Sequence, residues 1–181
     1  MLHLKNITAG NPKTAEQYQM TKRHSIVWLF SEDGKNWYEE QKNFASDTIK
    51  VAYNERGRVV WIGKDVTGIE PTNVSIIELP DITTNRRITA PGYWFYRNDE
   101  FVFDYKLKAE DERDAQLQRV SIMTSEWEKD LLLGLISDED REKLKAYRIY
   151  AKSLQAMDFS TITDKASYNA IEWPVSPEAS S

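Results

Sequence analysis

The sequence predicts an α+β protein with a β-rich N-terminal domain, then an antiparallel helical hairpin and an extended C-terminal tail that contains a Trp-Pro pair. Three observations lead to this prediction. Up to about residue 105 the apolar residues come in short runs between turn residues, the pattern of β-structure. After Lys108 they recur about every 3.6 residues, the period of a helix. From residue 160 this period is lost, so the expected parts are residues 1–108, 109–159 and 160–181.

The first predicted hairpin has Asp33-Gly34 at its turn. The apolar residues 26–30 precede this turn, and a second element that begins with Trp37 and Tyr38 follows it. Asp-Gly between apolar segments is a strong hairpin signal, because glycine tolerates the positive φ that such a turn requires.

The rest of the β-rich part contains two more hairpins, a single strand and one helix. Thr14 is expected to N-cap the helix, with Gln17 as its partner in a capping box. The single strand, Val74–Leu79, is stopped by Pro80, which cannot donate to a strand ladder. The two hairpins are predicted from β-branched and aromatic runs at residues 48–53 with 58–62, and 93–96 with 101–105.

Two helices are predicted after residue 108. Gly134 ends the first, and Ser137 begins the second as its N-cap, with acidic residues in the first turn. Trp173 is expected to anchor the tail that follows. The first helix has one apolar face, made of Leu117, Val120, Met123, Trp127 and Leu131. The facing seam on the second helix is made of Leu144, Tyr147, Ala151 and Leu154.

Composition and charge exclude several classes of protein. The chain has no cysteine, which excludes disulfides, thiolate metal sites and cysteine nucleophiles. Residues 1–108 carry 15 basic and 14 acidic residues, whereas residues 109–159 carry 8 and 12. The β-rich part therefore lacks the concentrated positive charge that phosphate binding needs, and we expect no nucleic-acid partner. No long apolar run or basic leader is present, so we expect no membrane partner and a cytoplasmic location.

We predict no catalytic site and no cofactor. The only histidines are His3 and His24, and no spacing suggests a metal site. No Gly-x-Ser-x-Gly elbow and no phosphate-binding glycine loop occurs. Carboxylate pairs such as Glu32-Asp33 and Glu39-Glu40 stand in turns or at helix starts, where capping and solvation explain them better than general acid–base chemistry.

The aromatic side chains are the one unusual feature, at 12% of the chain. Exposed aromatics are frequent anchors of protein interfaces, because they bury much area at low entropic cost. Trp37 and Tyr38 follow a polar turn, so they are expected to be exposed. A core role for most aromatics, or a sugar-binding platform, remains open. The candidate partner-binding residues are Trp37, Tyr38, Trp61, Trp94 and Tyr96.

Several short stretches, in this order, resemble the tail fibre assembly proteins of tailed bacteriophages, most closely the Mu-like members. They include Asn11-Pro12-Lys13-Thr14, Ser31-Glu32-Asp33-Gly34-Lys35-Asn36-Trp37-Tyr38, Pro80-Asp81-Ile82 and Ile171-Glu172-Trp173-Pro174. The resemblance implies a chaperone that works in the host bacterial cytoplasm. Its expected partner is the C-terminal, receptor-binding tip of the tail fibre, whose folding and trimerisation it promotes.

Two other functions remain open at this point. The protein could be a permanent component of the virion tail fibre tip that assists attachment to the host surface, or a small glycan hydrolase. We expect the β-rich part to bind the fibre, with the acidic helical hairpin as the competing site.

Overall fold

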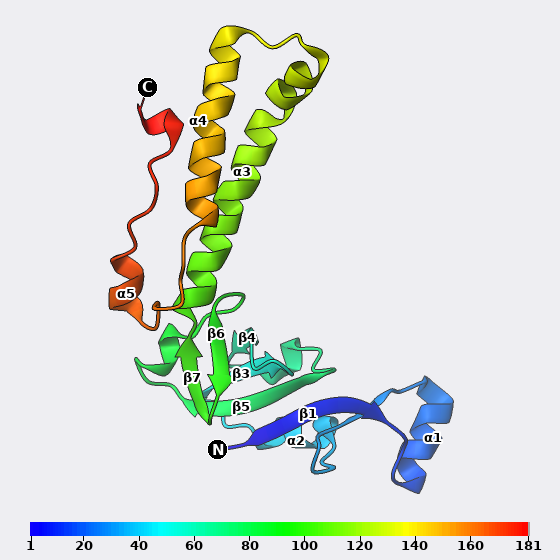
Figure 1. The fold of residues 1–181 in the computed structure, drawn as a ribbon. Coiled ribbons are helices and arrows are strands. Elements are labelled where there is room, and N and C mark those ends of the chain that lie inside the picture. The colour runs from blue at the N-terminus through cyan, green and yellow to red at the C-terminus, as the bar shows by residue number, and fades with distance from the viewer. Residues whose placement is uncertain (181) are drawn as a thin grey trace. The chain divides into compact units, whose positions relative to one another are not determined.

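The computed structural model describes residues 1–180 and confirms the α+β class. The chain divides into two compact units, Met1–Phe103 and Asp104–Ser181 (Figure 1). The division precedes residue 108 because the long helix begins earlier than its apolar period suggests. Asp104 caps that helix, since its carboxylate accepts a hydrogen bond from the Leu107 amide at 2.9 Å.

The first unit contains two antiparallel sheets. The larger has five strands in the order β2-β1-β5-β3-β4, and the smaller is the β6-β7 ribbon (Figure 1). The strands are β1 (His3–Gly10), β2 (Trp28–Phe30), β3 (Thr48–Asn54), β4 (Val59–Gly63), β5 (Val74–Pro80), β6 (Trp94–Arg97) and β7 (Glu100–Phe103).

Two of the three predicted hairpins are confirmed, β3–β4 and β6–β7, and a backbone hydrogen bond at Gly57 connects them. The β3–β4 turn contains Gly57 at φ +79°, and a side chain at this position would collide with the carbonyl of Tyr96. The Tyr96 amide donates to the Gly57 carbonyl at 2.7 Å, which attaches the ribbon to the sheet. The β6–β7 turn has positive φ at both Asn98 and Asp99, as a tight two-residue hairpin requires.

The second arm of the hairpin around Asp33-Gly34 is shorter than a strand. It forms a single bridge, between Phe30 and Asn36, and then becomes helix α2 (Trp37–Glu40). Asn36 ends the extended arm and caps α2. Its side-chain oxygen accepts a hydrogen bond from the Tyr38 amide at 2.9 Å, which starts a helical turn.

Helix α1 (Ala15–His24) begins where the sequence predicted. Thr14 caps it by accepting the Gln17 amide at 3.1 Å. The predicted capping box is wrong in one partner. The Gln17 side chain accepts a hydrogen bond from the amide of Lys13, one residue before the expected Thr14 amide.

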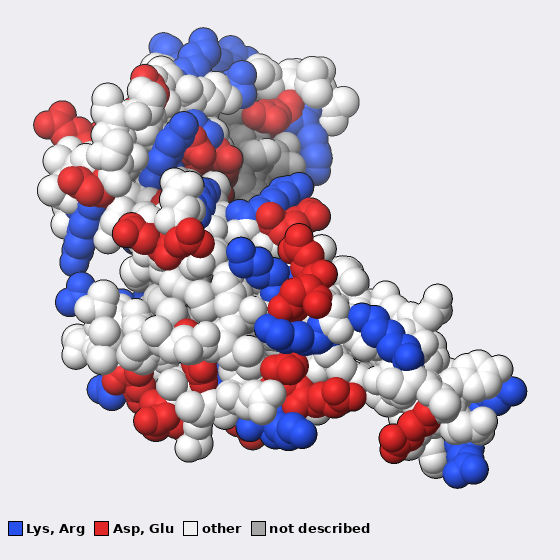
Figure 2. Space-filling view, turned by 90° about the horizontal axis from the view of Figure 1, so that it is seen from below, with Lys and Arg blue, Asp and Glu red and all other residues white. Residues whose placement is uncertain are grey.

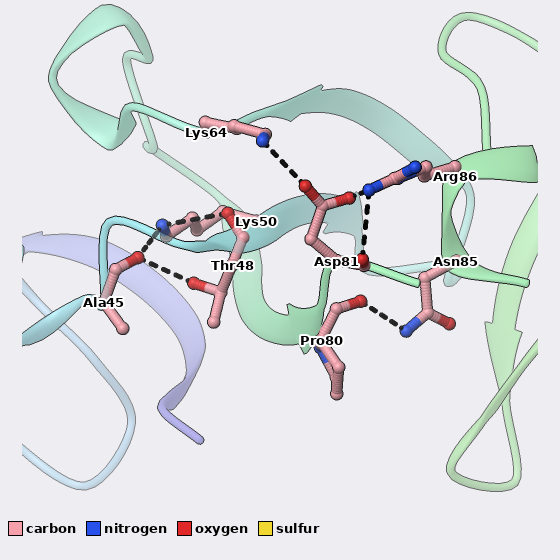
Figure 3. Close-up of polar contacts among 8 residues, drawn as sticks. All are labelled: Ala45, Thr48, Lys50, Lys64, Pro80, Asp81, Asn85 and Arg86. Atoms are coloured by element: carbon pink, nitrogen blue, oxygen red, sulfur yellow. Dashed lines mark hydrogen bonds and ion pairs between the residues drawn. The ribbon is translucent and has the colours of Figure 1, made fainter. Parts of the chain in front are cut away.

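A buried pair of charged residues fixes the centre of the large sheet. Lys50 on β3 and Glu78 on β5 are register partners, with only 1% and 5% of their surface exposed. The Lys50 ammonium donates to the carbonyls of Ala45 and Thr48 (Figure 3). The Glu78 carboxylate accepts from the amides of Leu2 (3.0 Å) and Ala45 (2.6 Å) and from the Thr48 hydroxyl (2.7 Å). These bonds tie the start of β1 and residues 45–48 to the sheet.

The second unit is a helical hairpin with a return segment. It contains α3 (Tyr105–Leu133), α4 (Asp138–Gln155) and the short α5 (Lys165–Asn169). Gly134 ends α3 in the left-handed conformation at φ +72°, and Ser137 caps α4. The core between the helices is made of Val120, Tyr147, Tyr150, Ala151 and Leu154.

Two details of this unit differ from the sequence prediction. Leu131, expected on the apolar face, is 46% exposed, because the tip of the hairpin extends beyond the buried seam. The tail is not wholly extended either, since it contains α5, which Asp164 and Ser167 start with a capping box. Trp173 packs against the hairpin core, and its ring lies 5.7 Å from that of Phe159.

The buried seam predicts a mutant that separates the two units. Leu154→Asp places an unpaired charge at a fully buried position, which costs several kcal/mol. We expect limited proteolysis to cleave residues 104–181 rapidly while residues 1–103 stay protected. Ile149→Asp on the same helix is the control, since Ile149 is 59% exposed and its replacement should leave the pattern unchanged. Equal loss of both units in Leu154→Asp would show that they unfold together.

Candidate partner-binding surface

Tyr38 is an exposed aromatic ring that is nevertheless held in place. It is 46% exposed, and its hydroxyl donates to the carbonyl of Val27 at 2.8 Å. Its ring and that of Trp28 are nearly perpendicular, at a centroid distance of 5.8 Å. A ring fixed in this way loses little rotational freedom when a partner covers it, which favours binding.

Trp37, the neighbouring residue, is not at the surface. It is 2% exposed and belongs to a core cluster that includes Leu4, Leu29 and Ile76. The exposure expected from the polar turn is therefore wrong for Trp37. The physical reason is the helix that begins here: adjacent residues point in directions about 100° apart, so only Tyr38 faces solvent.

The other three candidate rings are half-buried and contact other aromatic rings or the core. Trp61 packs against the cluster that holds Trp37, and Trp94 packs against a second cluster around Val51. Tyr96 stacks on Tyr53 at 4.7 Å. Burial, with the hydrogen bond from its hydroxyl to the Asp99 carboxylate, raises the pKa of Tyr96 to about 12. The structure does not gather the five predicted residues into one patch.

Three exposed apolar or aromatic residues that precede Tyr38 in the sequence were not among the predicted binding residues. Val27 is 61% exposed, and on α1 Tyr18 and Met20 are 50% and 38% exposed. Helix α1 is fixed to β2 by the Trp28 indole, which donates to the Thr21 hydroxyl at 2.7 Å. Tyr18 and Met20 are two residues apart, so they point to different sides of α1 and no apolar stripe could have been recognised. Val27 and Tyr38 are held together by their hydrogen bond, and we call these two residues the β2-edge patch.

The charges of the molecule are mixed in sign. Figure 2 shows acidic and basic side chains interspersed over the face in view. Among the described residues, no group of three His, Asp or Glu side chains is placed to hold a metal ion. No helix in that part of the chain is long and apolar enough to cross a membrane.

Asp81, in the Pro80-Asp81-Ile82 stretch, organises the loop after β5. Its carboxylate lies 2.7 Å from the Lys64 ammonium and 2.6 Å from the Arg86 guanidinium, and the Asn85 side chain donates to the Pro80 carbonyl at 2.9 Å (Figure 3). Hydrogen bonds from Arg86 and Lys64 lower the pKa of Asp81 to about 2. These contacts fix the loop that follows β5.

Comparison with known proteins shows similarity along almost the whole chain. Residues 39–178 match the sequence model of the Caudovirales tail fibre assembly protein, lambda gpK. The tail fiber assembly protein U' of Escherichia phage Mu is 46% identical over 168 residues, which are 90% of this chain and 95% of that protein. The U' protein of Escherichia phage P1 has the same identity and coverage. Tail fiber assembly protein U of phage Mu is 38% identical over 98% of this chain and all of its own length.

The environment of Asp81 predicts an acid-dependent contribution to stability. A carboxyl group whose pKa is lower in the folded than in the unfolded state stabilises the fold at pH values above its unfolded pKa, which is about 3.9 for Asp. This stabilisation is lost as the pH falls through the pKa of the folded state. Asp81→Asn should therefore lower the Tm at pH 7, and the difference from the parent should close as the pH falls through about 2. Asp47→Asn, at an exposed position, should leave the Tm unchanged. A difference that persists undiminished at the acid end would contradict this role.

Proposed function

The chain belongs to the Caudovirales tail fibre assembly protein family, and we propose that it is a chaperone that binds the C-terminal, receptor-binding tip of a phage tail fibre. In this proposal it promotes folding and trimerisation of the fibre in the host cytoplasm. Its role in tail fibre assembly follows from membership of the family. The partner segment, the trimerisation step and the binding surface are the proposal.

The observation that best supports a protein-binding role is the β2-edge patch. It presents exposed apolar and aromatic side chains, among which Tyr38 is fixed by a hydrogen bond and a ring contact. Such anchors account for most of the binding energy in protein interfaces. The first 108 residues also carry almost no net charge, so a partner of either charge meets little long-range repulsion as it docks.

A physical reason for a chaperone comes from the fibre. Intertwined β-trimers have high contact order and expose unpaired strand edges while they assemble, so they fold slowly and tend to aggregate. A partner that covers apolar surface on the fibre tip lowers the concentration of aggregating species and needs no nucleotide for this effect.

The chaperone role predicts a change in the yield of fibre. The fibre polypeptide produced alone should be largely insoluble, and co-production with this chain should give a soluble trimer, measured by sedimentation and size-exclusion chromatography. Equal trimer yields with and without the chain would remove the chaperone role. Recovery of the chain in purified virions, at a fixed ratio to the fibre, would support a permanent tip component instead.

The β2-edge patch predicts a specific loss of binding. Replacing an interface hot-spot aromatic by alanine costs about 2 kcal/mol or more, so Tyr38→Ala should weaken capture of the fibre tip roughly thirtyfold without lowering the Tm appreciably. Val60→Ala is the matched control, because Val60 is 42% exposed and lies on β4, at the opposite edge of the sheet. Undiminished capture by Tyr38→Ala would place the binding surface elsewhere. Trp37→Ala is unsuitable as a test, since it would open a cavity in the core.

A further inference from the structure

The tip of the helical hairpin exposes a group of leucines. Leu132 is 87% exposed, and Leu133 and Leu135 are each 71% exposed. With Leu131 they surround Gly134, where α3 ends. We call these four residues the leucine tip. Large aliphatic side chains that are grouped and open to water mark a surface that another molecule covers.

A groove adjoins the leucine tip between α3 and α4. It has a volume of about 580 Å³. Its apolar part comes from Leu131, Leu132 and Leu144, and Leu144 is 5% exposed, so the groove reaches the buried seam. A groove with an apolar base and an exposed apolar rim suits the apolar face of an amphipathic segment.

The polar side chains of the groove are mostly basic. Arg141, Lys145 and Arg148 line it, against the single carboxylate of Glu128. Within the described part of the chain, Arg141 and Arg148 form no ion pair, and Lys145 contacts only the Glu142 carboxylate, at 3.5 Å. The three cations follow one another at intervals of four and three residues, so they lie along one side of α4. The groove therefore complements a segment that carries acidic side chains.

We propose that this groove holds an acidic amphipathic segment of the fibre polypeptide, a second contact besides the β2-edge patch. This inference rests on the proposed function. The apolar face of the segment packs on Leu131, Leu132 and Leu144, and its carboxylates pair with Arg141, Lys145 and Arg148. Charge-assisted pairs beside an apolar groove give both affinity and register.

Two other occupants fit the groove less well. An anionic lipid surface is wider than the groove, so it would also meet acidic residues that do not line the groove, namely Asp130, Asp138, Glu139 and Asp140. A second copy of the chain, paired groove to groove, would bring the same three cations of each copy together, because such a symmetric contact is made by one patch with itself.

The lack of cysteine in the chain permits a direct test. Leu132→Cys introduces a unique thiol that can be labelled with a benzophenone maleimide, and the labelled full-length chain is photo-cross-linked to the co-produced fibre. We expect a cross-linked fibre peptide, identified by mass spectrometry, that contains apolar residues flanked by Asp or Glu. Ile122→Cys is the control: Ile122 is 69% exposed on α3 and does not line the groove, so it should cross-link little.

A charge reversal tests the chemistry of the groove. Arg148→Glu, added to Leu132→Cys, should lower the cross-linking yield about tenfold. Lys129→Glu makes the same change of charge outside the groove and should leave the yield unchanged. A salt concentration of about 1 M, where the Debye length is about 3 Å, should also lower the yield.

The outcomes separate this inference from the proposed function. If the trimer yield depends on the chain but Leu132→Cys captures no fibre peptide, the groove inference is overturned and the chaperone role stands. Cross-links to a second copy of the chain, or flotation with vesicles of phosphatidylcholine and phosphatidylglycerol that Leu132→Glu abolishes, would also overturn it. If the trimer yield is independent of the chain, the proposed function fails and this inference fails with it.

Discussion

The register of the first unit depends on the buried pair of Lys50 and Glu78. Both side chains are almost fully removed from water, and every polar atom of each must therefore find a partner within the fold. Glu78 meets this demand with three donors from two different segments, the start of β1 and residues 45–48. A shift of β3 against β5 by one residue would place Lys50 and Glu78 on opposite faces of the sheet and separate Glu78 from its donors Ala45 and Thr48. The pair therefore specifies one alignment of the central strands.

The candidate binding surface depends on this alignment. Strand β1 lies between β5 and β2, so the position of β1 decides where β2 begins and ends. Strand β2 in turn supplies Trp28, which holds α1 through Thr21 and supports the ring of Tyr38. Polar interactions in the sheet thus determine the geometry of the exposed Tyr38 ring at its edge. This is the arrangement expected of a binding surface carried on a rigid support.

The parts of the fold that depend on local interactions could be predicted from the sequence, and the parts that depend on distant contacts could not. Turns at Gly57 and Gly134 and the cap at Ser137 involve neighbouring residues only, so their positions were found correctly. The burial of Trp37 depends on strands that lie far away in the sequence, and a polar turn beside it gives no sign of them. The leucine tip escaped notice because Leu131 continues the apolar pattern of the first helix, and nothing local shows that Leu131 and its neighbours are exposed in the fold.

We propose above all that the first unit recognises the fibre through the edge of its large sheet. Hydrogen–deuterium exchange of the full chain, with and without the fibre tip, measures this most directly. We expect slower exchange of backbone amides in residues 15–38 when the fibre is bound, with the central strands unchanged because they are already protected. Slower exchange confined to residues 104–180, with residues 15–38 unaffected, would contradict it.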